Sequence, residues 1–253
     1  AERTLTQMLR GGLFDHIGGG FCRYSTDERF LVPHFEKMLY DNALLILAYC
    51  EAYSITRKKL YLLAAERTAD FVLREMTAPE GGFYSAQDAD SDGVEGKYYL
   101  FTPEELVRLL GPEQGEAFNR HFDITDAGNF EGKNIPNLLH SDPEDRSFNG
   151  LLENVYEYRK SRCALRLDDK ILTAWTGLMI AALCRLYQGS GGQNTWTPRN
   201  GRTVFSGSVS GTVSRSTSVS GPGSGVKRGS WTTTPPASSP SWHYTEPRWS
   251  KRI

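Results

Sequence analysis

Residues 11–42 of this 253-residue chain read GGLFDHIGGGFCRYSTDERFLVPHFEKMLYDN. Glycine clusters and aromatic rings surround a dense set of titratable groups here, and an apolar segment follows directly. Loops of this composition often carry binding or catalysis, because a rigid scaffold holds their polar groups in place. We therefore expect a functional site in this stretch. Its polar side chains include Asp15, His16, Arg23, Tyr24, Asp27, His34, Glu36 and Asp41.

The rest of the chain predicts two kinds of helix. A helix is predicted over residues 35–53. Its segment 43–50 and the later run 171–187 are apolar nearly all round, which is typical of a helix buried on every side. Residues 60–76 and 147–163 collect their apolar side chains on one face, which predicts a solvated back. This alternation predicts an all-α fold in which outer helices surround inner ones.

Shorter elements are predicted between these helices. Residues 97–101 favour a short β-strand. A helix is then expected to begin after Thr102, which can cap it, with Pro103 in its first turn. Gly111 and Pro112 should end that helix.

Charge divides the chain at about residue 188. The overall formal charge is -1, but residues 189–253 hold eight Lys or Arg against one Glu, which leaves about -8 for residues 1–188. An acidic globular part lacks the basic face of a nucleic-acid-binding protein. Residues 189–253 contain no Leu and are rich in Ser, Thr, Gly and Pro, so we expect a disordered tail.

The cysteines indicate a reducing compartment. Their wide spacing gives neither a CxxC pair nor a zinc-finger pattern, and we expect ordinary buried thiols. A cytosolic location is favoured, with secretion open if an upstream signal is missing, because the chain starts as a fragment would. The most apolar run, residues 171–184, is too short to span a bilayer, so no membrane partner is expected. The four cysteines are Cys22, Cys50, Cys163 and Cys184.

The segment PHFEKMLYDN, residues 33–42, places its polar groups in helical register. On a helix, His34 and Asp41 share one face, and Glu36 lies on another. At a helix start the macrodipole disfavours the imidazolium, so a neutral His34 could act as a general base. The alternative is a structural His and Glu that tie the helix start to the preceding loop.

Two other polar loops contain partial matches to cofactor-binding motifs. The run of glycines at 18–20 has neither of the phosphate-binding spacings, so a nucleotide site is not expected. Asp88 and Asp90 open a sequence like an EF-hand loop, but its twelfth position is Tyr99 rather than Glu, and we expect no metal and no other cofactor. Carboxylates near a cleft suit acid–base chemistry, and a solvated acidic turn is the alternative.

Four motifs in order resemble the spermatogenesis-associated protein 20 family. They are the stretch quoted above, GGFYSAQDADSDGVEGKYYLFTPEEL, GNFEGKNI and DDKILTAWTGLMIAAL. The resemblance covers about residues 1–187. It implies an (α/α)6 toroid of the six-hairpin glycosidase and sugar-epimerase type, which a thioredoxin-like domain precedes in full-length members. We expect this chain, as a fragment, to hold a partial toroid over residues 1–188.

Two functions follow from the residues and the resemblance. The first is a carbohydrate-active or carbohydrate-binding protein, and the family name links it to spermatogenesis. The second is a non-catalytic interaction protein on an inherited enzyme scaffold, whose protein partners the sequence does not identify. In the first, the acid–base groups would be Asp15, His34, Glu36, Asp41, Asp88 and Asp90. The ligand would be held by Arg23, Tyr24, Asp169 and Trp175.

Overall fold

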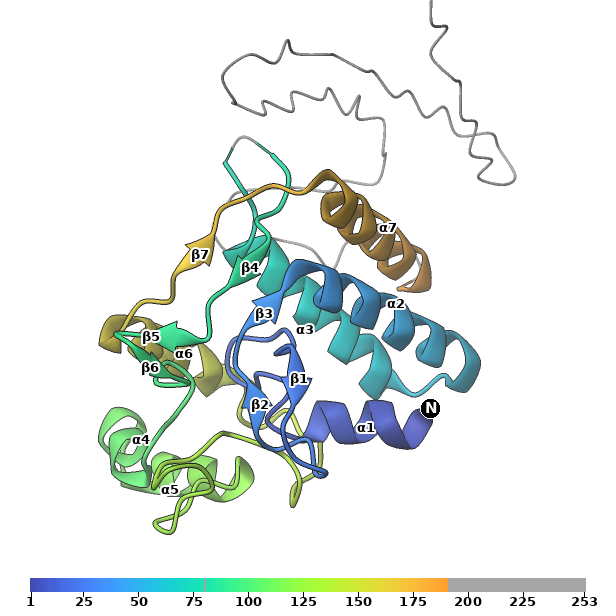
Figure 1. Cartoon of the computed structure of the whole chain (residues 1–253). Helices are drawn as coiled ribbons and strands as arrows, with labels where there is room; N and C mark the ends of the chain where they lie inside the picture. Colours follow the sequence, from blue (N-terminus) through green and yellow to red (C-terminus); the bar gives the residue numbers. More distant parts are fainter. Residues whose placement is uncertain (80, 191–253) are drawn as a thin grey trace, which may run out of the picture. The chain divides into compact units, whose positions relative to one another are not determined.

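The computed structural model describes residues 1–79 and 81–190, and about half of these residues are helical (Figure 1). The predicted tail over residues 189–253 therefore lies outside the described residues from residue 191 onward. The helices are α1 (Glu2–Arg10), α2 (Leu39–Thr56), α3 (Lys59–Glu75), α4 (Pro103–Leu110), α5 (Pro112–His121), α6 (Asn149–Arg162) and α7 (Thr173–Gly189). The strands are β1 (Tyr24–Ser25), β2 (Pro33–His34), β3 (Lys37–Met38), β4 (Ala86–Gln87), β5 (Asp90–Ser91), β6 (Val94–Glu95) and β7 (Leu167–Asp168).

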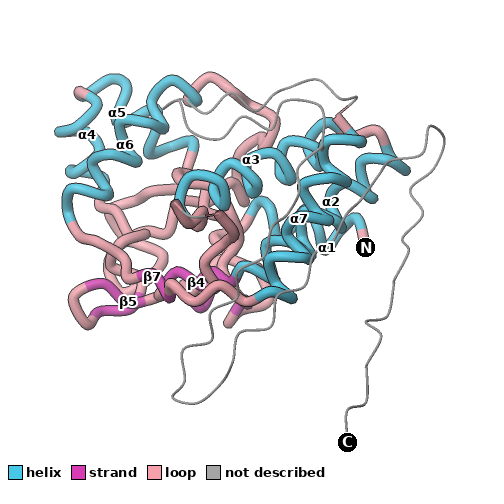
Figure 2. The backbone as a smooth tube through the Cα atoms, turned by 90° about the horizontal axis from the view of Figure 1, so that it is seen from above, coloured by secondary structure: helices cyan, strands magenta, loops and turns pink. Residues whose placement is uncertain are grey.

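Helices α2, α3 and α7 form one packed group, in which α2 contacts both of the others (Figures 1 and 2). The prediction that residues 43–50 are buried all round is wrong, because Leu44 in α2 is 49% exposed. Helix α7 also exposes Ile180, at 39%. The described residues thus leave one apolar side of these helices uncovered, and a toroid is not confirmed.

The start of α4 follows the predicted capping chemistry. The Thr102 hydroxyl accepts a hydrogen bond from the Glu105 backbone N–H, and the Glu105 carboxylate accepts one from the Thr102 backbone N–H. Pro103 occupies the first turn. This reciprocal capping box satisfies two N–H groups that a helix start otherwise leaves unpaired.

The helix predicted over residues 35–53 begins later than expected, at Leu39. Residues 33–38 are extended, since β2 pairs with β1 and β3 pairs with β4. Side chains along this segment alternate between buried and half-buried, a period of two that fits a strand and not a helix. The prediction that His34 lies at a helix start is therefore wrong. The macrodipole reasoning no longer applies to it.

A three-stranded sheet joins segments that are far apart in sequence. Its order is β3-β4-β7, with Met38 paired to Ala86 and Ala86 paired to Asp168. Helices α2 and α7 begin soon after β3 and β7. The predicted strand over residues 97–101 is replaced by one isolated bridge, between Phe101 and Asn134.

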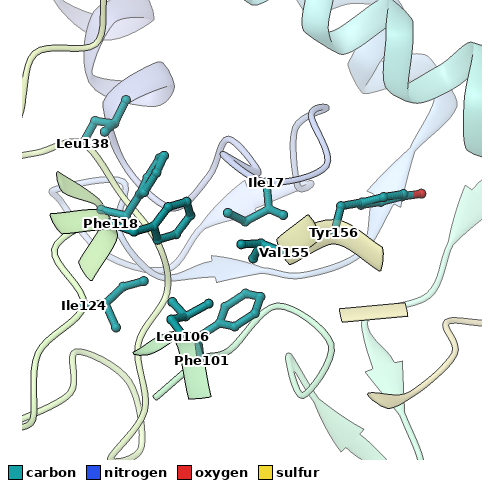
Figure 3. Packing of buried hydrophobic residues seen from close by; sticks show 9 residues of the cluster. Ile17, Phe101, Leu106, Phe118, Ile124, Leu138, Val155 and Tyr156 are labelled. Carbon is teal, nitrogen blue, oxygen red and sulfur yellow. The ribbon is translucent and has the colours of Figure 1, made fainter. Parts of the chain in front are cut away.

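An apolar core packs α4, α5 and α6 against the glycine-rich loop, residues 11–20 (Figure 3). Ile17 from that loop lies close to Val155 of α6 in this core. The loop is thus held by the core beneath it. The buried members are Ile17, Phe101, Leu106, Phe118, Phe122, Ile124, Leu138, Val155 and Tyr156.

The structure tests the predictions made for the cysteines and for membrane-spanning helices. Cys22, Cys50 and Cys163 are buried, as predicted, but Cys184 is exposed on α7. Among the described residues, every helix is too short or too polar to cross a bilayer.

Candidate functional site

The extended segment at residues 33–38 sorts its side chains onto two faces. Phe35 and Lys37 point into the protein, and each of these two residues is about 1% exposed. The side chains of His34 and Glu36 lie on the opposite face and are 28% and 26% exposed. Because successive side chains of a strand alternate, His34 and Glu36 become neighbours on the accessible face.

Three side chains surround the His34 imidazole. Tyr24 is its cross-strand partner, and the two rings stack with centroids 5.1 Å apart. Nδ1 lies 2.7 Å from Glu95 Oε1, and Nε2 lies 3.7 Å from Glu36 Oε2. The ring is therefore held between an aromatic face and two carboxylates.

Arg23 connects this histidine to the start of α2. Its Nη1 donates to Glu36 Oε2 at 3.0 Å. The neighbouring Tyr40, and then the charge of Glu36, raise the pKa of Arg23. The Tyr40 ring contacts Trp175 of α7 edge-on, with centroids 4.8 Å apart. Two helices thus contribute aromatic rings beside the charged groups.

Asp41 in the first turn of α2 has an unusual environment. Burial raises the pKa of its carboxyl to about 6, against the opposing charge of Arg23. Its Oδ2 is buried and has no hydrogen-bond partner among the described residues. A carboxyl with a pKa near neutrality can both give and accept a proton.

We call these residues the His34 cluster. It unites six of the predicted site residues with two that the sequence did not single out, Tyr40 and Glu95. Its members are Arg23, Tyr24, His34, Glu36, Tyr40, Asp41, Glu95 and Trp175.

Asp15 does not join the cluster, because the structure places it in the core. Its carboxylate accepts two hydrogen bonds of 2.9 Å from Arg159 and one of 2.8 Å from Lys37. Backbone N–H groups of Ile17 and Gly18 also donate to it, each at 3.0 Å. Burial opposes ionisation, but Arg159 and Lys37 outweigh it and hold the pKa of Asp15 well below its usual range. All of its oxygens are committed to holding the loop.

The remaining predicted carboxylates lie outside the cluster. Asp90 is exposed on the β5–β6 hairpin and is the cross-strand partner of Glu95. Asp88 precedes the same hairpin and is exposed. Asp169 is exposed just after β7. No group of three or more His, Cys, Asp or Glu in residues 1–79 and 81–190 is placed to hold a metal ion.

Two cavities lie away from the cluster. One holds only about 10 Å³ and is enclosed by Asp15, His16, Cys22 and their neighbours. The other is an open groove of about 740 Å³ along α4 and α5. Neither is lined by a residue of the His34 cluster, in which the side chains of His34, Glu36 and Glu95 are 28%, 26% and 50% exposed.

Sequence reasoning missed Lys37, Arg159, Tyr40 and Glu95. One signal was present for Lys37: alternation of apolar and polar residues after Pro33 favours a strand, on which Lys37 shares the face of Phe35. For Glu95 and Arg159 no local signal exists, because their partners are 61 and 144 residues away.

The sequence has relatives among known proteins. No family model matches the sequence. The chain is 36% identical over 219 residues to "Spermatogenesis-associated protein 20" of Homo sapiens, and the match covers 72% of this chain and 28% of the human protein. The Mus musculus protein of the same name gives the same values. "Uncharacterized protein B0495.5" of Caenorhabditis elegans is 31% identical over 223 residues, covering 74% of this chain and 31% of that protein. The matched region is thus under a third of each relative's length.

Proposed function

This chain belongs to the spermatogenesis-associated protein 20 family, and we propose a function for it from that membership and from the His34 cluster. The cluster offers an accessible set of polar and aromatic groups. The proposed function is binding of a neutral, hydroxyl-rich carbohydrate at the cluster, with His34 available for acid–base chemistry. The name of the relatives connects the family to spermatogenesis. We infer the carbohydrate ligand from the residues of the cluster and from the resemblance to sugar-active folds described above.

Aromatic faces support this ligand class. Tyr24 is 52% exposed and stacks on His34, so the outer face of its ring is open to a ligand. Trp175 and Tyr40 provide a second aromatic pair. Apolar ring faces next to a few polar groups are characteristic of small-molecule sites that also fix ligand orientation.

The polar groups supply both acceptors and donors. Glu36 and Glu95 can accept hydrogen bonds from hydroxyl groups, and Arg23 can donate them. The carboxylates outnumber Arg23, which disfavours an anionic ligand. A neutral sugar satisfies this inventory without placing a negative charge beside Glu36 and Glu95.

The observation that carries the proposal is the position of His34. Its Nδ1 is 2.7 Å from Glu95, its ring stacks on Tyr24, and its side chain is still 28% exposed. A histidine held by a carboxylate at an accessible site can take a proton from a ligand and return it. A buried histidine such as His16 cannot serve in this way.

Calorimetric titration of the complete chain with a panel of neutral monosaccharides and disaccharides tests the proposal. We expect binding that Tyr24→Ala weakens by about fivefold to tenfold, since an aromatic contact contributes about 1 kcal/mol. His34→Ala should weaken or abolish turnover of any bound sugar. The matched control is Glu116→Gln, a charge change on α5 at a side chain that is 64% exposed. Equal binding by all variants, or no binding to any sugar, would contradict the proposal.

A second candidate is a non-catalytic interaction surface on the same scaffold. The observation that favours it is the exposure of the cluster, 28% for the His34 side chain and 50% for that of Glu95, whereas enzymes usually enclose their reacting groups. Sugar binding without any chemical change, measured by NMR of the recovered sugar, would support this candidate over catalysis.

A further inference from the structure

We infer that Glu95 is a positioning residue for His34. The Glu95 carboxylate fixes the proton on His34 Nδ1, so that His34 Nε2 faces the ligand. The inference deepens the proposed function, because it assigns the roles of the two ring nitrogens in the His34 cluster. Glu95 lies within the second motif quoted above, but neither the sequence pattern nor the names of the relatives assign it a role.

The contact geometry is the first support. Nδ1 of His34 lies 2.7 Å from Glu95 Oε1, which is the length of a charge-assisted hydrogen bond. The carboxylate of an ionised Glu can only accept, so the proton lies on Nδ1. Nε2 then carries the lone pair in the neutral ring, and its separation of 3.7 Å from Glu36 leaves it without a direct hydrogen bond to that group.

The second support is how the two residues are held. His34 lies on β2, which pairs with β1, while Glu95 lies on β6 of a separate hairpin. The Tyr24 ring stacks on the imidazole at an interplanar angle of 29°, which limits its rotation. Each partner is therefore positioned by its own strand pair, and the hydrogen bond joins two hairpins 61 residues apart in sequence.

The chemistry that follows is a simple proton exchange. Nε2 takes a proton from a ligand hydroxyl or from an acidic C–H group, and the ring becomes an imidazolium. Glu95 remains an acceptor for the Nδ1 proton and stabilises that charge, and the same proton later returns from Nε2 to the ligand. This is how a carboxylate orients a catalytic histidine elsewhere, where it holds the tautomer without taking up the proton.

Nitrogen NMR of the complete chain labelled with 15N-histidine tests the assignment without any ligand. The His34 signal is identified by its loss in His34→Gln. In the unaltered protein we expect the proton on Nδ1, and in Glu95→Gln we expect that proton to exchange with solvent about tenfold faster or more, because a charged acceptor becomes neutral. Asp92→Asn is the matched control: it removes a carboxylate from the same hairpin that bonds to Lys97 and not to His34.

The outcomes separate this inference from the proposed function. A His34 proton on Nε2 in the unaltered protein, or identical spectra for Glu95→Gln and the unaltered protein, would overturn it. The spectrum of the unaltered protein decides the question even if Glu95→Gln fails to fold. Sugar binding with a proton on Nε2 would leave the proposed function intact, whereas an Nδ1 proton with no sugar binding would remove only the proposed function.

Discussion

Lys37 and Asp15 form a 2.8 Å ion pair in which the two side chains are only 1% and 3% exposed. Arg159 of α6 completes the group by bonding both oxygens of Asp15. Lys37 also donates to the Gly19 carbonyl at 2.8 Å and lies 4.2 Å from the centre of the Phe71 ring. Since Lys37 alternates with His34 and Glu36 along one extended segment, this buried group fixes the face on which the His34 cluster is built.

Replacing Asp15 with Asn should therefore destabilise the fold strongly. The change leaves two buried cations without their anion, a loss of about 3–5 kcal/mol by comparison with other buried pairs. Urea unfolding followed by circular dichroism measures it. Asp169→Asn, at an exposed position, is the control and should change stability by about 0.5 kcal/mol or less. Asp15→Asn with the stability of the control would mean that the buried group contributes nothing net.

Asp15 also predicts an acid-sensitive fold. The pKa of its carboxyl is well below the ordinary value in the folded protein, so below about pH 4 the unfolded chain binds a proton that the native state does not. The stabilisation is complete above that pH and is lost as pH falls toward the lowered native pKa. Unfolding free energies between about pH 2 and pH 4 should rise with pH, and Asp15→Asn should reduce the slope. An equal slope in both proteins would refute this.

Asp41 predicts the opposite dependence in a higher window. Burial raises the pKa of its carboxyl to about 6, so between about pH 4 and pH 6 the native state binds the proton more tightly than the unfolded chain does. Stability should decline as pH rises through this window, by about 1 kcal/mol after allowance for partial exposure. Asp41→Asn should remove the decline, as measured by thermal unfolding at each pH. A carboxyl titration of Asp41 near pH 4, followed by 13C NMR, would contradict the prediction.

The glycines at 18–20 provide a test of backbone packing. Gly19 has φ +78°, and a Cβ there would meet the Arg67 carbonyl oxygen at 2.4 Å. Gly132 has φ +75° with nothing within 4 Å, so it isolates the conformational cost alone. We expect Gly132→Ala to cost about 1 kcal/mol and Gly19→Ala about 1–3 kcal/mol more. Equal melting temperatures for the two variants would show that the loop does not approach α3 this closely.

Much of the helical fold could be predicted from local signals. The start of α4 could be predicted from Thr102 and Pro103, and the buried face of α3 from its one-sided apolar pattern. Capping and amphipathicity act over a few residues, so a short stretch of sequence contains both signals. Residues 35–38 were wrongly assigned to a helix because an apolar run follows them. Strand pairing of residues 33–38 with β1 and β4 decided the conformation instead, and a sequence window does not contain those partners.

The candidate site could be predicted only in part, because some of its contacts join residues that are far apart in sequence. Arg23, Tyr24, His34 and Glu36 were predicted as site residues, and the structure brings these four together. Asp15 looked equivalent to them in sequence, yet it is buried, because its two cationic partners come from residues 37 and 159. Only the folded chain separates an acid that faces solvent from one that holds the core.

Binding of a neutral carbohydrate at the His34 cluster is the central claim. The most direct measurement is NMR of the histidine-labelled complete chain during titration with the sugar panel. We predict that the His34 signals shift saturably with at least one sugar while those of His121, on α5, stay unchanged. Unchanged His34 signals across the whole panel, or equal shifts at both histidines, would contradict the claim.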